Sequence, residues 1–361
     1  MQLENYEMHL PSYSIGDDIY KNIGPVCCSY GKTVLIIGGK KALAAAEEKI
    51  RRAVAGTELQ IIGTELYGDD CTYRNVERLR KLPVYQEADM VFAVGGGKSL
   101  DTSKCLCIED DKPIFTFPTI ASNCAASTSV SIMYRDDGTF LKPHFFIRPA
   151  MHAFVDTEII SKAPVKYMWA GIGDTYAKYY EATISSRDEQ LEHYTALGVN
   201  ISRMCRDPLI QFGVKAYEDH KKQQCTYELE QIVLAIVITT GLASIFLTRD
   251  FTPDYNSGLA HAVFYALTEY PVIEKNHLHG EVVGFGVLLA LLYDGQEEEF
   301  QKIYQLNREI GLPTRLRDIE ITAEEFDETI EKIPFMSDVR HYPYAIEPKK
   351  LRNVIDRLES L

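Results

Sequence analysis

The segment that most constrains the fold of this chain is DMVFAVGGGKSLDTSK, residues 89–104, in which an apolar strand leads into three glycines and then a helix. Where side chains are missing, backbone N–H groups can approach a pyrophosphate closely, and the start of the following helix adds partial positive charge. Lys98 can supply a full positive charge. The segment therefore predicts a phosphate-binding turn at the carboxyl end of a buried strand.

Two better-known phosphate-binding motifs do not fit this segment. A P-loop ending at residues 97–99 requires glycine at the position of Phe92, and the G-x-G-x-x-G fingerprint requires glycine at the position of Leu100. The alternative without a ligand is a tight turn between a buried strand and a helix. Such turns usually use a single glycine, so the turn chemistry favours a nucleotide.

Length and composition bound the class of protein. A chain of 361 residues fits two domains of ordinary size. Its 38 basic and 52 acidic residues give a net charge of −14, which disfavours nucleic acids and anionic membranes as partners. Residues 1–6 lack the basic and apolar regions of an export signal, so we expect a cytoplasmic protein.

The apolar run 232–247 is shorter than a bilayer span and predicts a core helix. The eight cysteines form no Cys-x-x-Cys pair, and we expect reduced, mostly buried thiols.

The two halves of the chain have different patterns. Short β-branched runs alternate with helical segments in the first half, which predicts a Rossmann-like parallel sheet with crossover helices and strands at 33–37, 59–62, 90–94, 114–117 and 153–155. Residues 129–134 and 140–147 predict an antiparallel hairpin with a turn at Asp137 and Gly138. After residue 160 the periodicity is helical throughout. We therefore predict an α/β domain over 1–160 and an all-α domain over 161–361.

Four motifs occur in a fixed order along the chain: GGGK followed by Asp101, then FPTIAS at 117–122, AGIGD at 170–174 and HLHGE at 277–281. Together they resemble the iron-containing alcohol dehydrogenase superfamily, especially its glycerol dehydrogenases and hydroxycarboxylate dehydrogenases. The resemblance covers essentially the whole chain. It implies a dehydroquinate synthase-like fold, a nicotinamide cofactor on the α/β domain, a divalent metal on the helical domain and substrate between them.

The resemblance implies that Asp174, His261 and His279 bind the metal. A carboxylate with two neutral imidazoles suits zinc, iron or manganese, and zinc is the expected ion. Such an ion would polarise a carbonyl and stabilise an alkoxide. Taken singly, each histidine could be a hydrogen-bonded core residue, and Asp174, which follows a Gly-x-Gly sequence, could be the N-cap at the start of a helix.

Two further residues near these ligands are candidate catalytic groups. Where iron-type members carry a fourth ligand histidine, this chain has Lys178, one helical turn after Asp174. Its ammonium could pair with Asp174, bind a substrate carboxylate, or polarise a carbonyl in place of a metal. His277 is the candidate for a proton relay, although it could equally be structural.

The substrate is predicted from one position in the loop after residue 118. Glycerol dehydrogenases carry an aspartate there, and this chain has Cys124. Losing that negative charge makes the pocket more favourable to an anion, so we expect Cys124 and Asp174 to contact a small 2-oxo acid that is reduced to a 2-hydroxy acid. The alternative role of Cys124 as a nucleophile lacks an identifiable base.

The cofactor is predicted from the end of the first strand. NAD-using glycerol dehydrogenases have aspartate where this chain has Gly39, so the usual acceptor for the ribose 2′-hydroxyl is missing. Lys40 and Lys41 could instead pair with a 2′-phosphate, or could be ordinary solvated lysines. We therefore expect NADP(H) rather than NAD(H).

The resemblance also implies the other cofactor contacts. Thr119 and Ser122 are in addition typical of helix starts, and Val130 and Tyr134 alternate like strand residues that could belong to the core. The predicted cofactor-binding residues at these positions are Gly96, Gly97, Lys98, Asp101, Thr119, Ser122, Thr128, Val130 and Tyr134.

Taken together, the sequence predicts an NAD(P)-dependent, metal-assisted dehydrogenase acting on a small molecule, and a homo-oligomer is typical of this size and family. The alternatives are a glycerol dehydrogenase, a glycerol-1-phosphate dehydrogenase, or a cofactor-binding protein without catalysis. A lyase of the dehydroquinate synthase type would need a set of basic residues for a phosphorylated substrate, which this sequence does not show.

Overall fold

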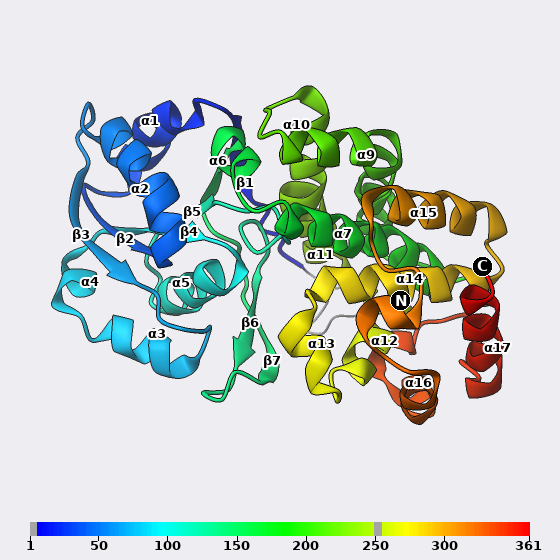
Figure 1. Ribbon diagram of the computed structural model, residues 1–361. Coiled ribbons are helices and arrows are strands. Elements are labelled where there is room, and N and C mark those ends of the chain that lie inside the picture. The colour runs from blue at the N-terminus through cyan, green and yellow to red at the C-terminus, as the bar shows by residue number, and fades with distance from the viewer. Residues whose placement is uncertain (1–5, 249–254) are drawn as a thin grey trace. The chain divides into compact units, whose positions relative to one another are not determined.

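In a computed structural model that describes residues 6–248 and 255–361, the chain divides into two units, Met1–Ala163 and Pro164–Leu361. The first unit is built on a sheet in which every neighbouring pair of strands is parallel, in the order β1-β8-β5-β4-β2-β3 (Figure 1). Its strands are β1 (Ser12–Gly16), β2 (Thr33–Gly38), β3 (Gln60–Leu66), β4 (Met90–Gly95), β5 (Ile114–Pro118) and β8 (His152–Asp156). The five predicted strands are confirmed. β1, whose sequence SYSIG has no apolar run, was not predicted and pairs only with β8.

Helices cover both faces of this sheet. In Figure 1, α1 and α2 lie on one face, and α3, α4 and α5 lie on the other. The face under α1 and α2 is an apolar core that includes Phe92, Phe115, Phe117 and Phe154. The helices of the unit are α1 (Ile23–Cys27), α2 (Lys40–Val54), α3 (Tyr73–Arg80), α4 (Pro83–Glu87), α5 (Gly97–Glu109) and α6 (Thr157–Ser161).

The predicted hairpin is also present. β6 (Val130–Tyr134) and β7 (Phe140–Phe145) form a separate antiparallel pair, with Gly138 at a φ of 87° in the turn. Ser131 donates a hydrogen bond of 2.9 Å to the Asp101 carbonyl, which attaches the hairpin to α5.

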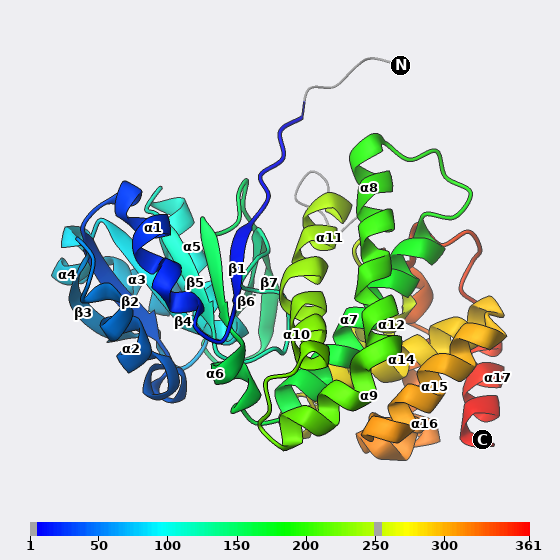
Figure 2. The same ribbon diagram turned by 90° about the horizontal axis from the view of Figure 1, so that it is seen from above.

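The described residues of the second unit form helices joined by loops and turns and no strand, as predicted. In Figures 1 and 2, its longest helix, α7, lies next to α14. Its helices are α7 (Lys166–Ser185), α8 (His193–Ser202), α9 (Asp207–Lys221), α10 (Tyr227–Leu234), α11 (Thr240–Leu247), α12 (Leu259–Leu267), α13 (Pro271–Asn276), α14 (His279–Asp294), α15 (Glu297–Ile310), α16 (Ala323–Ile330) and α17 (Pro348–Glu359).

One continuous helical stretch, Tyr227–Leu247, is long and apolar enough to cross a membrane. It comprises α10, a π-helical turn at Ala235–Thr239, and α11. Within its most apolar window, 72% of the stretch is buried inside the structure, which matches the core helix predicted over 232–247.

None of the eight cysteines forms a disulfide bond. Five of them are buried, Cys28 and Cys124 are half-buried, and Cys225 is exposed. The expectation of unbonded, mostly buried thiols is confirmed.

Candidate functional site

The three predicted metal ligands come together inside the second unit. Asp174 lies on α7, His261 on α12 and His279 at the first position of α14. The Asp174 Oδ1 atom is 3.6 Å from His261 Nε2 and 3.4 Å from His279 Nε2. Two ligand atoms on one tetrahedral zinc, each at roughly 2.0–2.1 Å, are about 3.3 Å apart. The three side chains therefore fit a divalent ion in both donor type and spacing.

Glycines bring the ligand-bearing helices close enough for this spacing. A Cβ atom on Gly173 would lie 2.2 Å from the Gly280 carbonyl oxygen, and one on Gly280 would lie 2.1 Å from the Ala170 carbonyl oxygen. Gly286 makes the same kind of approach to Ala260 on α12, with a Cβ 2.6 Å from the carbonyl oxygen. Each glycine permits a helix contact that any side chain would obstruct.

The position of Asp174 in its helix differs from the prediction. The Gly-x-Gly sequence before Asp174 does not start a helix, because α7 begins at Lys166 and Asp174 lies in its interior. The reading of Asp174 as an N-cap is therefore wrong. The glycines before Asp174 lie inside α7, where Gly173 allows close packing against α14, and they do not mark the start of a helix.

A carboxylate that the sequence analysis did not identify orients His261. The fully buried Glu181, also on α7, accepts hydrogen bonds from the His261 backbone N–H at 2.9 Å and pairs with Nδ1 at 2.7 Å. This contact leaves Nε2 directed to the Asp174 side, the arrangement by which carboxylates commonly orient metal-binding histidines. No motif marks Glu181; only its spacing of seven residues, two helical turns after Asp174, places both on one face of α7.

Electrostatics at the cluster favours a bound cation. Burial opposes ionisation of Asp174, yet hydrogen bonds from His261 and His279 hold its pKa well below the usual range. Burial likewise disfavours the imidazolium of His261, but the charge of Glu181 and the contact with Asp174 raise its pKa to about 10. The cluster therefore favours a positive charge, which a bound metal ion would supply.

Lys178 is buried but does not pair with Asp174. Its ammonium donates to the Asn256 carbonyl and, at 2.7 Å, to Asn256 Oδ1. Asn256 is in turn held by a hydrogen bond of 3.0 Å to the Ser244 hydroxyl. The side chain is therefore fixed in one direction by the segment that precedes α12.

His277 lies between two carboxylates. Its Nδ1 is 2.8 Å from Glu281 Oε1, and its Nε2 is 3.4 Å from Glu320 Oε1. The other oxygen of Glu281 accepts from the Leu278 backbone N–H at 2.9 Å, which caps the start of α14. These contacts hold the His277 ring in place next to the predicted ligand His279, and its role as a proton relay stays a prediction.

The predicted phosphate-binding turn forms at the carboxyl end of β4, in the first unit. Gly95 has a φ of 147°, which disfavours other residues, and Gly96 is the N-cap of α5 without a side-chain capping bond. A Cβ on Gly96 would lie 2.5 Å from Ile120, and one on Gly97 would lie 2.8 Å from the Asn123 amide. The first N–H groups of α5 thus lack a capping side chain, as an anion site at a helix start requires.

Lys98 has partners in the structure. Its ammonium lies 2.6 Å from Asp70 Oδ2 and 4.5 Å from the centre of the Tyr134 ring. Tyr134 is the last residue of β6, so the structure brings these two predicted cofactor residues together. A phosphate at the turn would compete with Asp70 for Lys98.

Asp101 points into the protein and has a partner that the sequence analysis missed. It lies 3.0 Å from the ammonium of Lys104, which is completely buried, and it accepts from the Ile132 backbone N–H at 3.1 Å. Lys104 also donates to Thr128 Oγ1 at 3.2 Å and to the Val130 carbonyl at 2.6 Å. These buried polar groups hold the hairpin and the preceding loop against α5.

Four further predicted cofactor and substrate residues lie in the loop between β5 and β6, and Val130 is the first residue of β6. No helix begins in this loop, so Thr119 and Ser122 do not start one. Thr119 and Thr128 are buried, whereas Ser122, Cys124 and Val130 are half-buried. The Cys124 carbonyl accepts from the backbone N–H of residues 127 and 128, which closes a turn.

The residues predicted to select the cofactor lie at the carboxyl end of β2. Gly39 is the N-cap of α2, and a Cβ there would lie 3.3 Å from the Tyr67 ring. Lys40 and Lys41 are exposed in the first turn of α2, and neither has an ion-pair partner among the described residues. Both ammonium groups are thus available to an anion.

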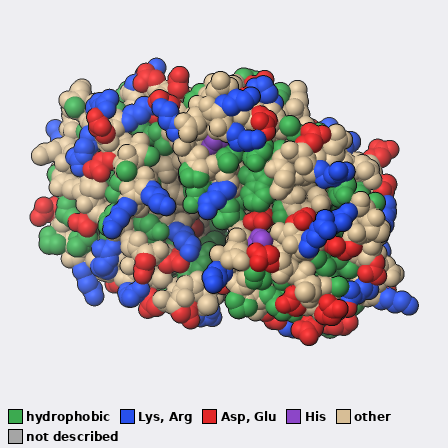
Figure 3. Space-filling view, in the orientation of Figure 1, with side chains coloured by type: hydrophobic (Ala, Val, Ile, Leu, Met, Phe, Trp, Pro, Cys, Tyr) green, Lys and Arg blue, Asp and Glu red, His purple; other side chains and the backbone are tan. Residues whose placement is uncertain are grey.

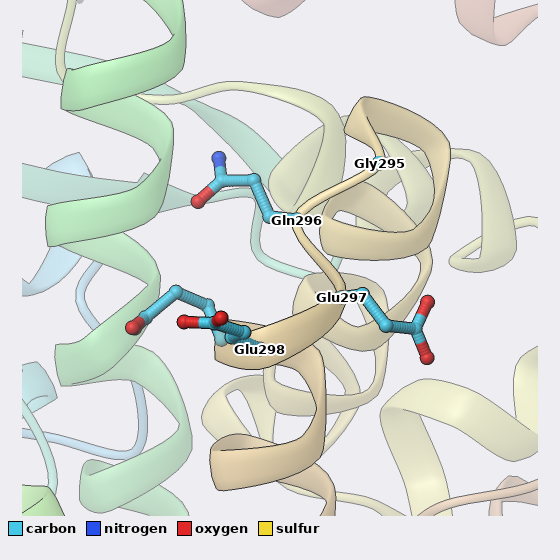
Figure 4. Close-up of a pocket in the computed structure, with 5 residues that line it drawn as sticks. Gly295, Gln296, Glu297 and Glu298 are labelled. Carbon is cyan, nitrogen blue, oxygen red and sulfur yellow. The ribbon is translucent and has the colours of Figure 1, made fainter.

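A surface hollow formed by residues 295–299 contains none of the predicted site residues. On the face shown in Figure 3, acidic and basic side chains are mixed. A shallow hollow at the start of α15 is lined by residues 295–299 (Figure 4). Glu297 forms an ion pair with Arg357, and Glu299 forms ion pairs with Arg206 and Lys302.

Known proteins are similar to this chain in sequence and in fold. A family model described as iron-containing alcohol dehydrogenase matches residues 11–156. A glycerol dehydrogenase of Thermotoga maritima is 33% identical over 313 residues, covering 82% of this chain and 81% of that protein. Hydroxycarboxylate dehydrogenase A of Escherichia coli is 33% identical over 329 residues, covering 90% and 88%. Fold, site and relatives define an alcohol or hydroxy acid dehydrogenase. The chain belongs to the iron-containing alcohol dehydrogenase family.

Solved structures share the fold of this chain. A crystal structure of a probable glycerol dehydrogenase from Sinorhizobium meliloti superposes with a TM-score of 0.82 at 25% identity, covering 99% of both chains. Glycerol dehydrogenase of Schizosaccharomyces pombe gives a TM-score of 0.85 at 23% identity, covering 99% of this chain and 91% of that chain. Family membership implies a nicotinamide cofactor, a divalent metal and a small alcohol or hydroxy substrate.

Proposed function

We propose that this dehydrogenase reduces a small 2-oxo acid to a 2-hydroxy acid with NADPH. The observation that carries the choice of an acid is the half-buried Cys124, which replaces the aspartate of glycerol dehydrogenases by an uncharged side chain. The hydroxycarboxylate dehydrogenase of Escherichia coli, which matches 90% of this chain, supports an acid substrate.

The charge around the metal ligands supports the same choice. Asp174 and Glu181 are the carboxylates in contact with His261, and a divalent ion held there would add two positive charges. Lys178 adds a buried ammonium on the same helix, and positive groups in a partly buried site favour a carboxylate over a neutral polyol. In this proposal Lys178, oriented by Asn256 and one helical turn after Asp174, supplies the positive group for the substrate carboxylate.

The proposed roles of the chain's own residues follow from their positions. Asp174, His261 and His279 would hold the divalent ion, zinc being preferred, and that ion would polarise the substrate carbonyl. Glu181 keeps His261 in the tautomer whose Nε2 can bind a metal. Gly96, Gly97 and Lys98 would hold the pyrophosphate, and the nicotinamide supplies the hydride.

NADPH is proposed because of the start of α2. Gly39 leaves no carboxylate to repel a 2′-phosphate, and Lys40 and Lys41 are exposed lysines without ion-pair partners among the residues that the structure describes. The charge of α2 at its N-terminus adds to theirs. Replacing Gly39 by aspartate should shift the preference from NADPH to NADH, and Gly56→Asp, on an exposed turn, is the matched control.

The substrate is tested by following the absorbance of the reduced nicotinamide with 2-oxobutyrate, dihydroxyacetone and dihydroxyacetone phosphate, before and after chelation and zinc addition. We expect 2-oxobutyrate to have the highest kcat/KM. Cys124→Asp should lower it while raising that of dihydroxyacetone, and Cys225→Asp, at an exposed cysteine, should change neither. A wild-type preference for dihydroxyacetone with NADH would refute the proposal.

Glycerol dehydrogenase activity is the second candidate. It is favoured by two relatives so named, from Thermotoga maritima at 33% and Pseudomonas putida at 32% identity. The same substrate panel separates it from the acid reductase. We also propose that the protein is cytoplasmic and forms a homo-oligomer; cell fractionation would test the location, and sedimentation of the purified protein would test the oligomeric state.

A further inference from the structure

A second group of possible metal ligands lies in the first unit and shares no residue with the Asp174 cluster. Cys105 and Glu109 are one helical turn apart at the end of α5, and His144 lies on β7. Their ligand atoms all lie within 4.8 Å of one another. This set combines a thiol, an imidazole and a carboxylate, which are the ligands that zinc prefers in proteins.

The distances match a tetrahedral ion closely. Glu109 Oε1 lies 3.3 Å from His144 Nε2 and 3.7 Å from Cys105 Sγ. With zinc bonds of roughly 2.0–2.1 Å to oxygen and nitrogen and 2.3 Å to sulfur, the ideal separations are about 3.3 Å and 3.6 Å. Two of the three edges therefore already have the lengths that a bound zinc would impose.

Neighbouring side chains orient two of these ligands. The Tyr73 hydroxyl lies 2.9 Å from His144 Nδ1, which directs Nε2 toward Glu109. Arg80 donates to Glu109 Oε2 at 2.8 Å, so that Oε1 is the oxygen that faces Cys105 and His144. In known metal sites, hydrogen bonds from neighbouring residues fix the orientation of the side chains that bind the metal.

The exposed fractions of the three side chains indicate from which side a metal ion could reach them. Cys105 is completely buried, whereas the side chains of His144 and Glu109 are 24% and 34% exposed. An ion would enter from the histidine and glutamate side, with the cysteine at the base and a water as fourth ligand. Burial lowers the pKa of His144 below its ordinary value. Burial and the Glu109 carboxylate raise the pKa of Cys105, so metal binding must release the thiol proton.

We propose that Cys105, Glu109 and His144 form a zinc-binding site separate from the metal of the active site. Zinc there would join β7 to the end of α5 and so stabilise the β6–β7 hairpin, which carries Val130 and Tyr134. The alternative is a hydrogen-bonded cluster of the same three side chains with no affinity for metal. This inference does not depend on the substrate proposed above.

Cobalt distinguishes the two possible sites in the full-length protein, because Cys105 is the one sulfur ligand among the six side chains proposed for them. Metal-free protein kept reduced with a phosphine is titrated with Co²⁺, and we expect a sulfur-to-cobalt charge-transfer band in the near ultraviolet. The band should be absent in Cys105→Ala and weakened in His144→Gln. It should persist in Cys107→Ala, which removes a neighbouring buried cysteine outside the group.

Zinc content gives the second measurement. After dialysis against buffered zinc we expect about two ions per chain in the wild type and about one in His144→Gln, whose partly exposed position leaves folding intact. A protein that binds no metal at Asp174 would still show the sulfur band. The measurement therefore distinguishes a failure of the active-site proposal from a failure of the second zinc site. A wild type without the band, or a band that survives in Cys105→Ala, overturns the inference.

Discussion

The contact of α7 with α14 at Gly173 gives the sharpest prediction. An alanine Cβ at residue 173 would lie 2.2 Å from the Gly280 carbonyl oxygen, whereas carbon and oxygen atoms normally approach to about 3.3 Å. The two helices must therefore separate by about 1 Å. Overpacking of this kind costs about 1–3 kcal/mol of folding free energy.

The same displacement should weaken metal binding. Asp174 follows Gly173 directly on α7, and His279 precedes Gly280 on α14, so the separation acts on the 3.4 Å between their ligand atoms. Metal sites tolerate errors of about 0.2 Å in their bond lengths. We expect Gly173→Ala to lower zinc affinity by about 10–100-fold, the range found when the supports of metal ligands are removed.

Two assays test this reasoning: zinc affinity by competition with a chromophoric chelator, and stability by urea unfolding of the metal-free protein. Gly56→Ala is the control, because a Cβ on Gly56 meets no atom within 4 Å. Zinc affinity and an unfolding midpoint that both equal those of the wild type would refute the argument that glycine contacts set the ligand spacing.

Three further predictions follow from charged side chains that have a charged or imidazole partner. Lys104→Met should destabilise the protein by about 3–5 kcal/mol in urea unfolding, because it leaves Asp101 as an unpaired buried charge. Glu181→Gln should weaken zinc binding by about 10–100-fold in equilibrium dialysis while the protein stays folded, because His261 loses its charged partner. Although burial opposes ionisation of Glu299, its ion pairs lower its pKa to about 2, so its stabilisation is present above the ordinary pKa of about 4.3 and is lost as the pH falls toward 2. Because Glu299 is partly exposed and screened, Glu299→Gln should cost only about 1–2 kcal/mol at pH 7 and almost nothing near pH 2.

Each of these predictions has its own contrary result. Full stability of Lys104→Met would mean that the hairpin does not need the buried ammonium, and the double change with Asp101→Asn should recover part of the loss. Unchanged zinc affinity in Glu181→Gln would remove its orienting role. A deficit for Glu299→Gln that is constant with pH would show that lost packing, rather than lost charge, causes it.

Local sequence signals predicted much of the fold. The strands at β2, β4 and β5 are apolar runs between turn residues, and the alternation at β6 and β7 is visible in the sequence, so their existence required no tertiary information. β1 was missed because its polar sequence gains strand structure only from pairing with β8. Its formation depends on residues about 140 positions away in the chain, which no local pattern reports.

The candidate site was predicted less completely than the fold. The candidate ligands Asp174 and His279 lie in motifs, but the helix around Asp174 was misplaced because glycines that permit close packing resemble glycines at a boundary. The buried partners Glu181 and Lys104 were missed. Charged residues in a helical pattern are usually solvated, and only the fold determines which of them are enclosed with a counterion.

The start of α5 is a helix end that the chain itself does not complete. Gly96 supplies no side chain to accept from the first backbone N–H groups, whereas α3, for example, has Thr72 in that position. A dinucleotide phosphate at the turn would satisfy these donors and act as the absent cap. Cofactor binding should therefore slow hydrogen exchange along α5, and the coenzyme becomes part of what holds the secondary structure of its own binding unit.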